Sequence, residues 1–550
     1  MDRARPLLLV LSLLAGACTA DQRSDATVPP TTQVAAPTTV APVPTTTTTA
    51  PPTTRLEEQR LWAFPGPEHY EGDVLTLQLP LGDFGTHELG PTTLTIDGET
   101  APVRAILESD PLLGWYVVFP DAFDTAGEVG RHEVIVTAEI DGSRRRVGTG
   151  IEVLSASRRP AQESTATWDF VQTECCVLRY LTDSAAARDL DAVAELLDDK
   201  AAFVEKRFER PLPEVDITLI DVLWGNGGYS GTEVVVSYLD RDFGPRDAEV
   251  VGTTLAHELT HWMTDDLEQS ILPWPLEEGI AVYVTGGHFK PEDIAARTGA
   301  LHALGHFVPL AEFLDDFDEM QHESRYVEAA GLVDYLVERF GWDQFIEFYS
   351  STVRARSNSL WFDRAAQVTF GSGIAELSTG FAEWAAGQDP EPELDDLRLT
   401  IALQEARRAF QVSFAPYQNY FVFDSVRSAG QPAVALREAR DPGNVAAEAL
   451  IGWAQKLMAE RRSAEAAPVV EQIESIVETG RIDGGLGSQV LSVAERLDES
   501  GYELLEFEIR DGRAVAVATR LAPDREQFTF EMRADGSVDV DDLPDPVAIS

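Results

Sequence analysis

Residues Thr27 to Thr54 consist almost wholly of Pro, Thr, Ala and Val. A segment of this composition cannot bury a hydrophobic core, and it favours extended, polyproline-like conformations. At about 3.1 Å per residue it would reach on the order of 85 Å. The folded part of the chain therefore has to begin near residue 56, and we expect residues 19–55 to form a Pro/Thr-rich linker.

The first residues have the layout of an export signal. Arg3 and Arg5 give a basic start, an apolar run extends from Leu7 to Ala15, and small residues precede Cys18. The run is too short to span a membrane as a mature helix. Ala-Gly-Ala before Cys18 resembles a bacterial lipoprotein processing site, so we expect residues 1–18 to be a signal and Cys18 to be lipidated. Plain secretion is the alternative, and both place the mature protein outside the cytoplasm, either in the cell envelope or secreted.

The charge balance excludes several classes of partner. The chain has 43 Lys and Arg against 93 Asp and Glu, a formal net charge of -50, and a pI near 4.4. Such a surface repels phosphate backbones and anionic lipids. We therefore expect no nucleic-acid partner, and contact with a membrane only through a lipid at Cys18. The sequence predicts no particular oligomeric state.

Only three cysteines occur in the 550 residues: Cys18, Cys175 and Cys176. No disulfide framework can hold the fold, so each of about three or four expected domains has to bury its own core. Neighbouring Cα atoms lie about 3.8 Å apart, below the usual disulfide range. Cys175 and Cys176 could therefore form a strained vicinal disulfide or remain as two buried thiols, and the sequence does not decide between these alternatives.

Residues 56–161 contain short segments in which apolar and polar side chains alternate. Turn dipeptides such as Asp97-Gly98 and Asp141-Gly142 separate these segments. Strands at this spacing are typical of an immunoglobulin-like (Ig-like) β-sandwich, which would serve either as a spacer or as a binding module. The predicted strands are Asp73–Leu79, Thr92–Ile96, Trp115–Phe119 and His132–Ile140.

In residues 162–388 the pattern of apolar residues changes from strands alone to strands alternating with helices. Cys176–Tyr180 reads as a strand, and apolar residues then recur at helical spacing from Leu190 to Phe208. Ile217–Val222 is predicted to be another strand. A Gly-rich turn leads to a β-branched strand at Val234–Tyr238, at or near the edge of a sheet. This region is therefore expected to be a separate α+β domain.

An acidic, Pro-containing stretch after Gln388 marks another boundary. Residues Leu397 to Leu497 are predicted to be mostly helical. Hairpin signals follow at Asp511-Gly512 and Asp535-Gly536. We expect residues 389–550 to form an α+β accessory domain, so the whole chain is predicted to be multidomain.

One short motif carries recognisable chemistry. On a helix predicted to begin near Pro245, His257 and His261 stand four positions apart, and Glu258 follows the first of them. Residues i and i+4 share one helix face, so both imidazoles can converge on one ion. Glu258 is rotated by about 100° and can reach a water molecule on that ion. The H-E-x-x-H pattern thus indicates a metal site beside a general base.

A catalytic zinc ion needs a third protein ligand and an open position. The metzincin continuation of the motif, which adds a third histidine, would require Gly at position 264 and His at position 267, but the chain has Thr264 and Leu267 there. Downstream, Pro275 suits the first turn of a second helix. That helix contains Glu277 and Glu278, so the third ligand is expected to be a carboxylate.

These residues resemble the gluzincin zinc metallopeptidases, a group that includes thermolysin-like and aminopeptidase N-like enzymes. Their pattern is H-E-x-x-H followed by a helix with E-G-x-A, and here the second part is Glu278-Gly279-Ile280-Ala281. The likeness covers roughly residues 167–386. It implies a central α+β gluzincin domain in which His257, His261 and Glu278 hold Zn²⁺ and Glu258 is the general base, with Glu277 as the rival ligand.

The resemblance implies two further features. Tyr326-Val-Glu-Ala-Ala looks like the segment that supplies a transition-state tyrosine in aminopeptidase N-like enzymes, so Tyr326 would polarise the scissile carbonyl; a core tyrosine is the alternative. Val234–Tyr238 would be the edge strand that pairs with the substrate. The G-x-M-E-N segment with which aminopeptidases hold a free amine is missing. We therefore expect an endopeptidase acting on protein or peptide substrates.

Two classes of function remain on these grounds. The first is an exported zinc metallopeptidase, lipid-anchored or secreted. The second is a non-catalytic cell-surface binding or scaffold lipoprotein that retains a structural zinc site. The intact Glu258 favours the enzyme, because a structural site gains nothing from a general base beside an open coordination position.

Overall fold

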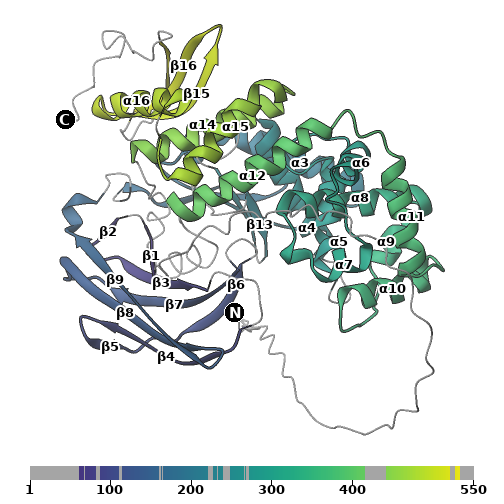
Figure 1. The fold of residues 1–550 in the computed structure, drawn as a ribbon, viewed down its shortest axis with the longest axis horizontal. Coiled ribbons are helices and arrows are strands. Elements are labelled where there is room, and N and C mark those ends of the chain that lie inside the picture. Colours follow the sequence, from purple (N-terminus) through teal and green to yellow (C-terminus); the bar gives the residue numbers. More distant parts are fainter. Residues whose placement is uncertain are drawn as a thin grey trace, which may run out of the picture. The chain divides into compact units, whose positions relative to one another are not determined.

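The computed structural model is drawn in Figure 1, and it contains four β-sheets together with a larger set of helices, so the architecture is mixed α and β. The predicted signal, the linker and the hairpin at Asp535-Gly536 lie outside the described residues. The structure describes residues 61–66, 68–81, 87–110, 114–159, 163, 165–220, 227–231, 233–238, 248–265, 267, 272–414, 441–482, 484–520 and 527–532.

The first folded region consists of two sheets. Its strands are β1 (Trp62–Phe64), β2 (His69–Tyr70), β3 (Val74–Pro80), β4 (Leu89–Ile96), β5 (Glu99–Ala101), β6 (Ile106–Asp110), β7 (Gly114–Asp124), β8 (Gly130–Ile140) and β9 (Ser143–Leu154). One sheet has the order β1-β3-β7-β6 and the other β2-β9-β8-β4-β5. All pairs are antiparallel except β2 and β9. The four strands predicted from the sequence are confirmed, with small shifts at their ends.

The two sheets share one hydrophobic core. Leu75 of β3, Val117 of β7 and Val134 of β8 are fully buried in it, and buried positions alternate with more exposed ones along β8. The turns at Asp97-Gly98 and Asp141-Gly142 have positive φ at both residues, 51° and 85° in the first and 53° and 72° in the second. Tight two-residue hairpins need this conformation, which Asp-Gly adopts readily.

A five-stranded sheet follows. Its strands are β10 (Trp168–Gln172), β11 (Val177–Leu181), β12 (Asp216–Ile220), β13 (Gly228–Ser230) and β14 (Val234–Ser237), and its order is β10-β11-β12-β14-β13. The inner strands β11, β12 and β14 run parallel, whereas both outer pairs are antiparallel.

The strand predicted at or near the edge, Val234–Tyr238, is β14 and lies next to the edge, so it is not itself the edge strand that the resemblance implies. The backbone N–H of Gly231 donates to the carbonyl of Glu233 at 3.0 Å, and this turn lays residues 228–230 antiparallel to β14. The glycine-rich segment thus supplies β13, the terminal strand, and β14 is the second strand from the edge.

Two long helices cover one face of this sheet. Residues Leu190–Phe208 form α3, with the bounds that the apolar spacing predicted, and Ala248–Asp265 form α4; Pro245 lies outside the described residues. Leu197 of α3 and Leu259 of α4 are fully buried in one core with Ile217 of β12. The short helices α2 (Ala185–Arg188) and η1 (Ala156–Arg158) precede α3.

The adjacent cysteines lie in the turn between β10 and β11. Cys175 and Cys176 are disulfide-bonded, so of the two alternatives the structure has the vicinal bridge. The carboxylate of Asp198 on α3 accepts hydrogen bonds from the backbone N–H groups of Glu174 and Cys175, at 3.1 and 3.0 Å. The turn is therefore attached to the helix that covers the sheet.

A helical group comes next in the chain. It comprises α5 (Trp274–Thr285), α6 (Ile294–Leu304), α7 (Leu310–Asp315), η2 (Phe317–Glu319), α8 (His322–Phe340), α9 (Trp342–Tyr349), α10 (Asn358–Thr369) and α11 (Ile374–Gly387). Helix α5 contacts both α4 and α8, and its residues Leu276 and Ile280 join an aromatic-rich core with Phe313 and Phe345. This core fixes α5 relative to the helices on which the site is built.

The remaining elements are helical and then extended, as predicted. They are α12 (Leu394–Phe414), α14 (Pro442–Ala459), α15 (Ser463–Thr479), α16 (Gly485–Glu499), β15 (Tyr502–Arg510), β16 (Arg513–Arg520) and β17 (Gln527–Met532). The hairpin at Asp511-Gly512 is confirmed. Leu397 of α12 is buried in a core with Leu301 of α6 and Val327 of α8. Packing therefore continues across the boundary expected after Gln388.

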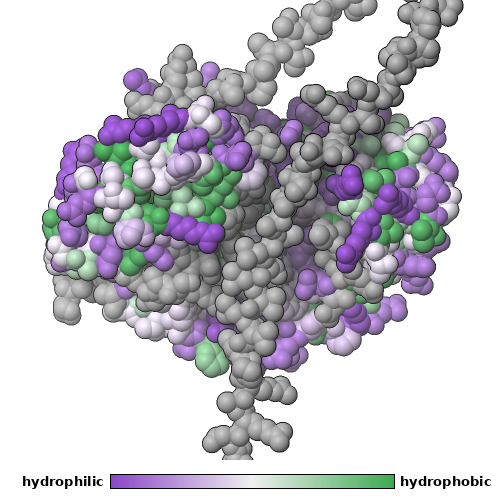
Figure 2. Space-filling view, turned by 90° about the horizontal axis from the view of Figure 1, so that it is seen from below, coloured by the Kyte–Doolittle hydropathy of each residue, from purple (hydrophilic) through white to green (hydrophobic). Residues whose placement is uncertain are grey.

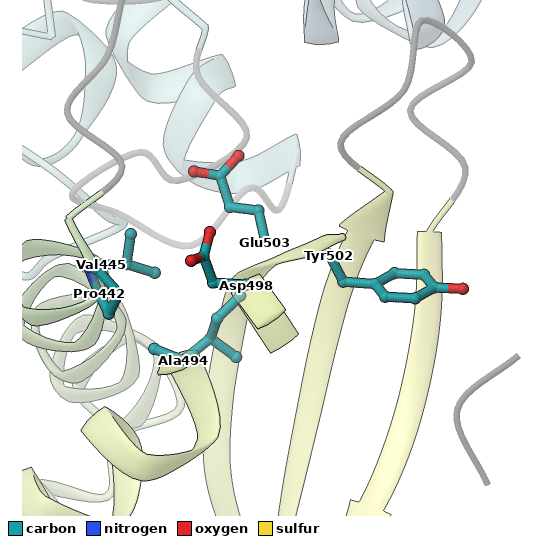
Figure 3. Close-up of a pocket in the computed structure, with 7 residues that line it drawn as sticks. Pro442, Val445, Ala494, Asp498, Tyr502 and Glu503 are labelled. Carbon is teal, nitrogen blue, oxygen red and sulfur yellow. The ribbon is translucent and has the colours of Figure 1, made fainter. Parts of the chain in front are cut away.

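A small hollow lies between α14, α16 and β15 (Figure 3). The side chains of Asp498 and Glu503 are on the same side of it, whereas the ring of Tyr502 points away (Figure 3). Its volume of about 10 Å³ is the space of a single water molecule. The hollow is too small for an organic ligand.

None of the described helices is long and apolar enough to cross a membrane. On the face drawn in Figure 2, hydrophilic residues are interspersed with smaller groups of hydrophobic ones. Among the described residues, the exposed large hydrophobic side chains lie on separate elements: Val129 before β8, Phe170 on β10, Phe203 on α3 and Val368 on α10. Single residues of this kind are common on protein surfaces and mark no docking patch.

Candidate metal centre

Helix α4 supplies three of the predicted site residues. Its apolar positions, including Leu255 and Leu259, face the sheet and are fully buried. Because a helix turns by about 100° per residue, the same packing directs His257 and His261 away from the sheet and towards α5. The burial of the apolar face of α4 against the sheet therefore sets the direction in which His257 and His261 point.

Helix α5 supplies the carboxylate. Pro275 lies in its first turn, as predicted, and Glu278 is buried on the side facing α4. A Cβ atom on Gly279 would lie 2.6 Å from the carbonyl oxygen of Ala329 on α8. Only glycine permits this close approach of α5 to α8, which explains why a glycine follows the carboxylate.

His257, His261 and Glu278 converge on one point. The two Nε2 atoms are 3.1 Å apart, and Oε2 of Glu278 lies 3.2 Å from Nε2 of His257 and 3.4 Å from Nε2 of His261. Ligands at about 2.0–2.1 Å from a tetrahedral ion lie about 3.3–3.4 Å from one another. The three donor atoms thus have the spacing that a small tetrahedral cation requires, and Glu277 does not belong to this set.

The second oxygen of Glu278 is held by a residue that the sequence reasoning missed. Nε1 of Trp274 donates a hydrogen bond of 2.6 Å to Oε1 of Glu278. The two residues are one turn apart on α5, so their i, i+4 spacing was a usable signal. With Oε1 engaged in this way, Oε2 is the oxygen that faces the imidazoles.

The three converging groups are strongly coupled electrostatically. Burial lowers the pKa of His257 to about 4. Burial also acts to lower the pKa of His261, but the carboxylate of Glu278 outweighs it and raises that pKa to about 9. Burial acts to raise the pKa of Glu278, yet the charge on His261 holds it well below its usual range. The positive charge favoured on His261 and the negative charge favoured on Glu278 therefore stabilise each other.

Glu258 lies on α4 beside this cluster and is buried, with 5% of its surface exposed. Burial raises its pKa to about 8, with His261 acting in the opposite direction. A Cβ on Gly228 would be 2.9 Å from Cγ and 3.1 Å from Oε1 of Glu258. The carboxyl group therefore lies directly against the edge strand β13.

Tyr326 of α8 also lies near the cluster. It is in the second turn of α8, which begins at His322. Its ring centroid is 6.4 Å from that of His257, and the residue is buried. Burial, together with the charge of Glu278, raises the pKa of its phenol well above the usual value. The phenol therefore remains a hydrogen-bond donor at neutral pH.

Three other histidine or acidic residues of the central region lie outside this cluster: His302, His306 and Glu233. His302 is exposed near the end of α6, and Gly305 ends that helix before His306. Glu233 is buried beside β14, and its carboxylate accepts a hydrogen bond from the hydroxyl of Thr218 on β12.

The chain was compared with models of known protein families and with curated proteins, and neither comparison gives a match.

Proposed function

We propose that this chain is an exported zinc-dependent metallopeptidase that hydrolyses peptide bonds. One observation carries the proposal. Three donor atoms from His257, His261 and Glu278 have the mutual spacing of ligands around one small cation, and the buried carboxylate of Glu258, the residue after His257, lies against the edge strand of a β-sheet.

Zinc is the metal proposed because two imidazoles and one carboxylate form a known donor set of catalytic zinc sites, and three protein ligands leave one position open. When bound, Zn²⁺ supplies Lewis-acid chemistry, which acidifies a water molecule and polarises the scissile carbonyl. The Trp274 hydrogen bond to Oε1 of Glu278 supports this assignment, because outer hydrogen bonds of this kind orient metal-ligating carboxylates.

The residues of the chain have separate roles in the proposed reaction. Glu258 accepts a proton from the attacking water on its carboxylate and then delivers that proton to the leaving amide nitrogen. The phenol of Tyr326 donates a hydrogen bond to the carbonyl oxygen as negative charge develops there. Both groups are buried, which strengthens these interactions by excluding bulk water.

The edge strand β13 is the proposed docking place for the substrate. An extended peptide adds to an exposed sheet edge through backbone hydrogen bonds. Because Gly228 of β13 lies against Glu258, a peptide paired there would have its backbone close to the base. Backbone pairing of this kind suits cleavage within chains, so we propose an endopeptidase.

The outer parts of the chain have proposed roles of their own. The two-sheet region is proposed to be an Ig-like β-sandwich that acts as a spacer, and the central region to be a gluzincin domain. Lipidation at Cys18, followed by the Pro/Thr-rich linker, would hold the folded part clear of a membrane.

The test uses the full chain with Glu258→Gln and Glu278→Gln, and with Glu277→Gln as the matched control. We expect wild type to bind about one zinc ion and to cleave denatured casein until a chelator removes the metal. Glu258→Gln should retain zinc and lose activity by about 10²- to 10⁴-fold. Glu278→Gln should lose zinc, whereas Glu277→Gln should keep both zinc and activity.

The outcomes separate the two classes of function. If wild type binds zinc and unfolds when the metal is removed, but cleaves neither casein nor a peptide library, the metal is structural and the scaffold function replaces the peptidase. Loss of zinc in Glu258→Gln would contradict its role as base. Loss of zinc in Glu277→Gln but not in Glu278→Gln would reassign the third ligand.

A further inference from the structure

An imidazole that the proposed mechanism does not use lies against Tyr326. His288 follows α5 in the chain, and its ring stacks on the ring of Tyr326 with centroids 4.1 Å apart and an interplanar angle of 10°. The same imidazole lies 6.3 Å from the ring of His257. His288 therefore forms one wall of the space that holds the tyrosine next to the metal centre.

The position of His288 is fixed through both its backbone and its side chain. Its backbone N–H donates to Oε2 of Glu292 at 3.1 Å, and its Nδ1 is 3.0 Å from Oε2 of Glu323. The preceding Gly287 has a φ of 155°, and a Cβ there would lie 1.8 Å from the carbonyl oxygen of Lys290. This tight turn fixes the backbone position from which the side chain of His288 projects.

Glu323 is itself held by an arginine that connects it to α12. Nη2 of Arg297 donates to Oε1 of Glu323 at 3.0 Å. Nη1 of the same guanidinium donates to Oδ2 of Asp396 at 2.7 Å and to Oε2 of Glu393 at 3.1 Å. Lys290 adds a second cation, whose Nζ is 2.6 Å from Oδ1 of Asp396.

This ion network is deeply buried. Arg297 is 1% exposed and Glu323 is 0% exposed. Buried charges of opposite sign that satisfy one another interact strongly in a low-dielectric interior, and removing one partner leaves the others uncompensated. The side chains of the network therefore have little freedom to rearrange.

We propose that His288 is a positioning residue that holds the ring of Tyr326 in its reactive orientation, and that the Glu323–Arg297 pair and Asp396 of α12 hold His288 in turn. This inference rests on the proposed peptidase function, in which Tyr326 donates to the scissile carbonyl. It also gives the C-terminal region a role at the site, because Asp396 of α12 and Glu393, the residue just before that helix, supply carboxylates that anchor Arg297.

The ring of Tyr326 needs a neighbour such as His288 because of the geometry of the tyrosine side chain. Rotation about the Cβ–Cγ bond of tyrosine is broad, so a flat neighbour is required to fix the ring plane. Catalytic groups have to be held to within about 0.5 Å and 10–20° by residues that are themselves locked. The stacked His288 ring, tied to Glu323, meets this requirement for Tyr326.

The experiment compares His288→Leu with His288→Phe in the full-length protein. Leucine removes the flat ring and the hydrogen bond to Glu323, whereas phenylalanine keeps a flat ring of similar size. His302→Leu is the control, because His302 is exposed and remote from the site. Each variant is also made together with Tyr326→Phe. The measurements are zinc content, kcat and KM on an internally quenched peptide that wild type cleaves, and a crystal structure of metal-free His288→Leu.

We expect Tyr326→Phe to lower kcat by about 10²-fold. His288→Leu should lower kcat by about tenfold with KM within threefold, on the scale of catalytic groups displaced by about 1 Å. It should have no further effect in the Tyr326→Phe background, and zinc content should stay unchanged. His288→Phe keeps the stacked ring but loses the bond to Glu323, so its kcat should lie between those of His288→Leu and wild type. In the crystal structure of His288→Leu, the Tyr326 ring should be rotated or displaced.

Additive losses in the double variant would overturn the inference, since His288 would then act independently of Tyr326. An unmoved Tyr326 ring in the His288→Leu crystal structure would overturn it as well. Failure of the proposed function has a different signature: wild type would cleave no peptide under any metal condition, while the crystal structure would still report whether His288 fixes the Tyr326 ring.

Discussion

Trp274 and Glu278 are joined by a hydrogen bond of 2.6 Å from Nε1 of the indole to Oε1 of the carboxylate, within one turn of α5. The other oxygen of Glu278 faces the two imidazoles of α4. The indole therefore decides which oxygen faces the imidazoles, although it lies outside the cluster of His257, His261 and Glu278.

Replacement of Trp274 by phenylalanine tests this relationship. The change keeps an aromatic ring but removes the donor, so the carboxylate is free to rotate. We expect zinc affinity to fall by about 10- to 100-fold, the usual effect of losing an outer hydrogen bond to a ligand. The measurement is a competition titration with a chromogenic chelator. Trp384→Phe is the control, because Trp384 donates a comparable bond of 2.7 Å to Glu338 on the exposed surface.

Substitution of Gly228 tests the placement of the base against the edge strand. A methyl group at this position would lie 2.9 Å from both Cγ of Glu258 and the carbonyl oxygen of Val235, so one of them has to move. We expect Gly228→Ala to lower kcat by about tenfold or more while zinc content is retained. Gly231→Ala should behave like wild type, since the nearest atom to its added methyl group is 4.0 Å away, on Tyr229. Equal activities of the two variants would contradict the placement.

Removal of Asp396 tests the contribution of α12 to stability. Its carboxylate pairs with Lys290 and Arg297, which would remain buried without it. We expect Asp396→Ala to lower the free energy of unfolding by about 3–5 kcal/mol, measured by urea denaturation. The neighbouring Asp395 pairs with Arg398 at the surface, where both side chains are largely exposed. Asp395→Ala should change stability by at most about 0.5 kcal/mol.

A histidine in the first folded region predicts a pH dependence of stability. Nδ1 of His132 is 2.8 Å from Oδ2 of Asp97. Burial acts to lower the pKa of His132, but the hydrogen bond and charge of Asp97 outweigh it, so its pKa is raised. A raised pKa in the folded state adds stability below the unfolded-state pKa of about 6.5, and this stability is lost as pH rises through the folded-state value.

The measurement is the melting temperature at pH 6 minus the melting temperature at pH 8. We expect this value to be lower in His132→Gln than in wild type, because the variant loses the stabilisation that is present at pH 6. His302→Gln, which changes an exposed histidine on α6, should leave the difference as in wild type. An unchanged difference in His132→Gln would show that the pair with Asp97 does not contribute.

Much of the local structure followed from patterns in the sequence. The apolar spacing predicted α3 with its observed bounds, and the Asp97-Gly98, Asp141-Gly142 and Asp511-Gly512 dipeptides marked hairpins correctly. These predictions succeed because helix periodicity and two-residue turns depend on residues close together in the chain. The sequence placed Val234–Tyr238 at or near the edge without deciding between the two, since strand order depends on pairing that no local pattern encodes.

The sequence by itself determined the candidate donors, because H-E-x-x-H on a helix places His257 and His261 on one face wherever that helix lies. Only the tertiary structure decided that Glu278, and not Glu277, faces them, that Gly228 lies against Glu258, and that His288 stacks on Tyr326. These relationships depend on the angles and distances at which α4, α5, α8 and β13 pack. Packing is set by the fit of many side chains from distant parts of the chain, so no short stretch of residues contains it.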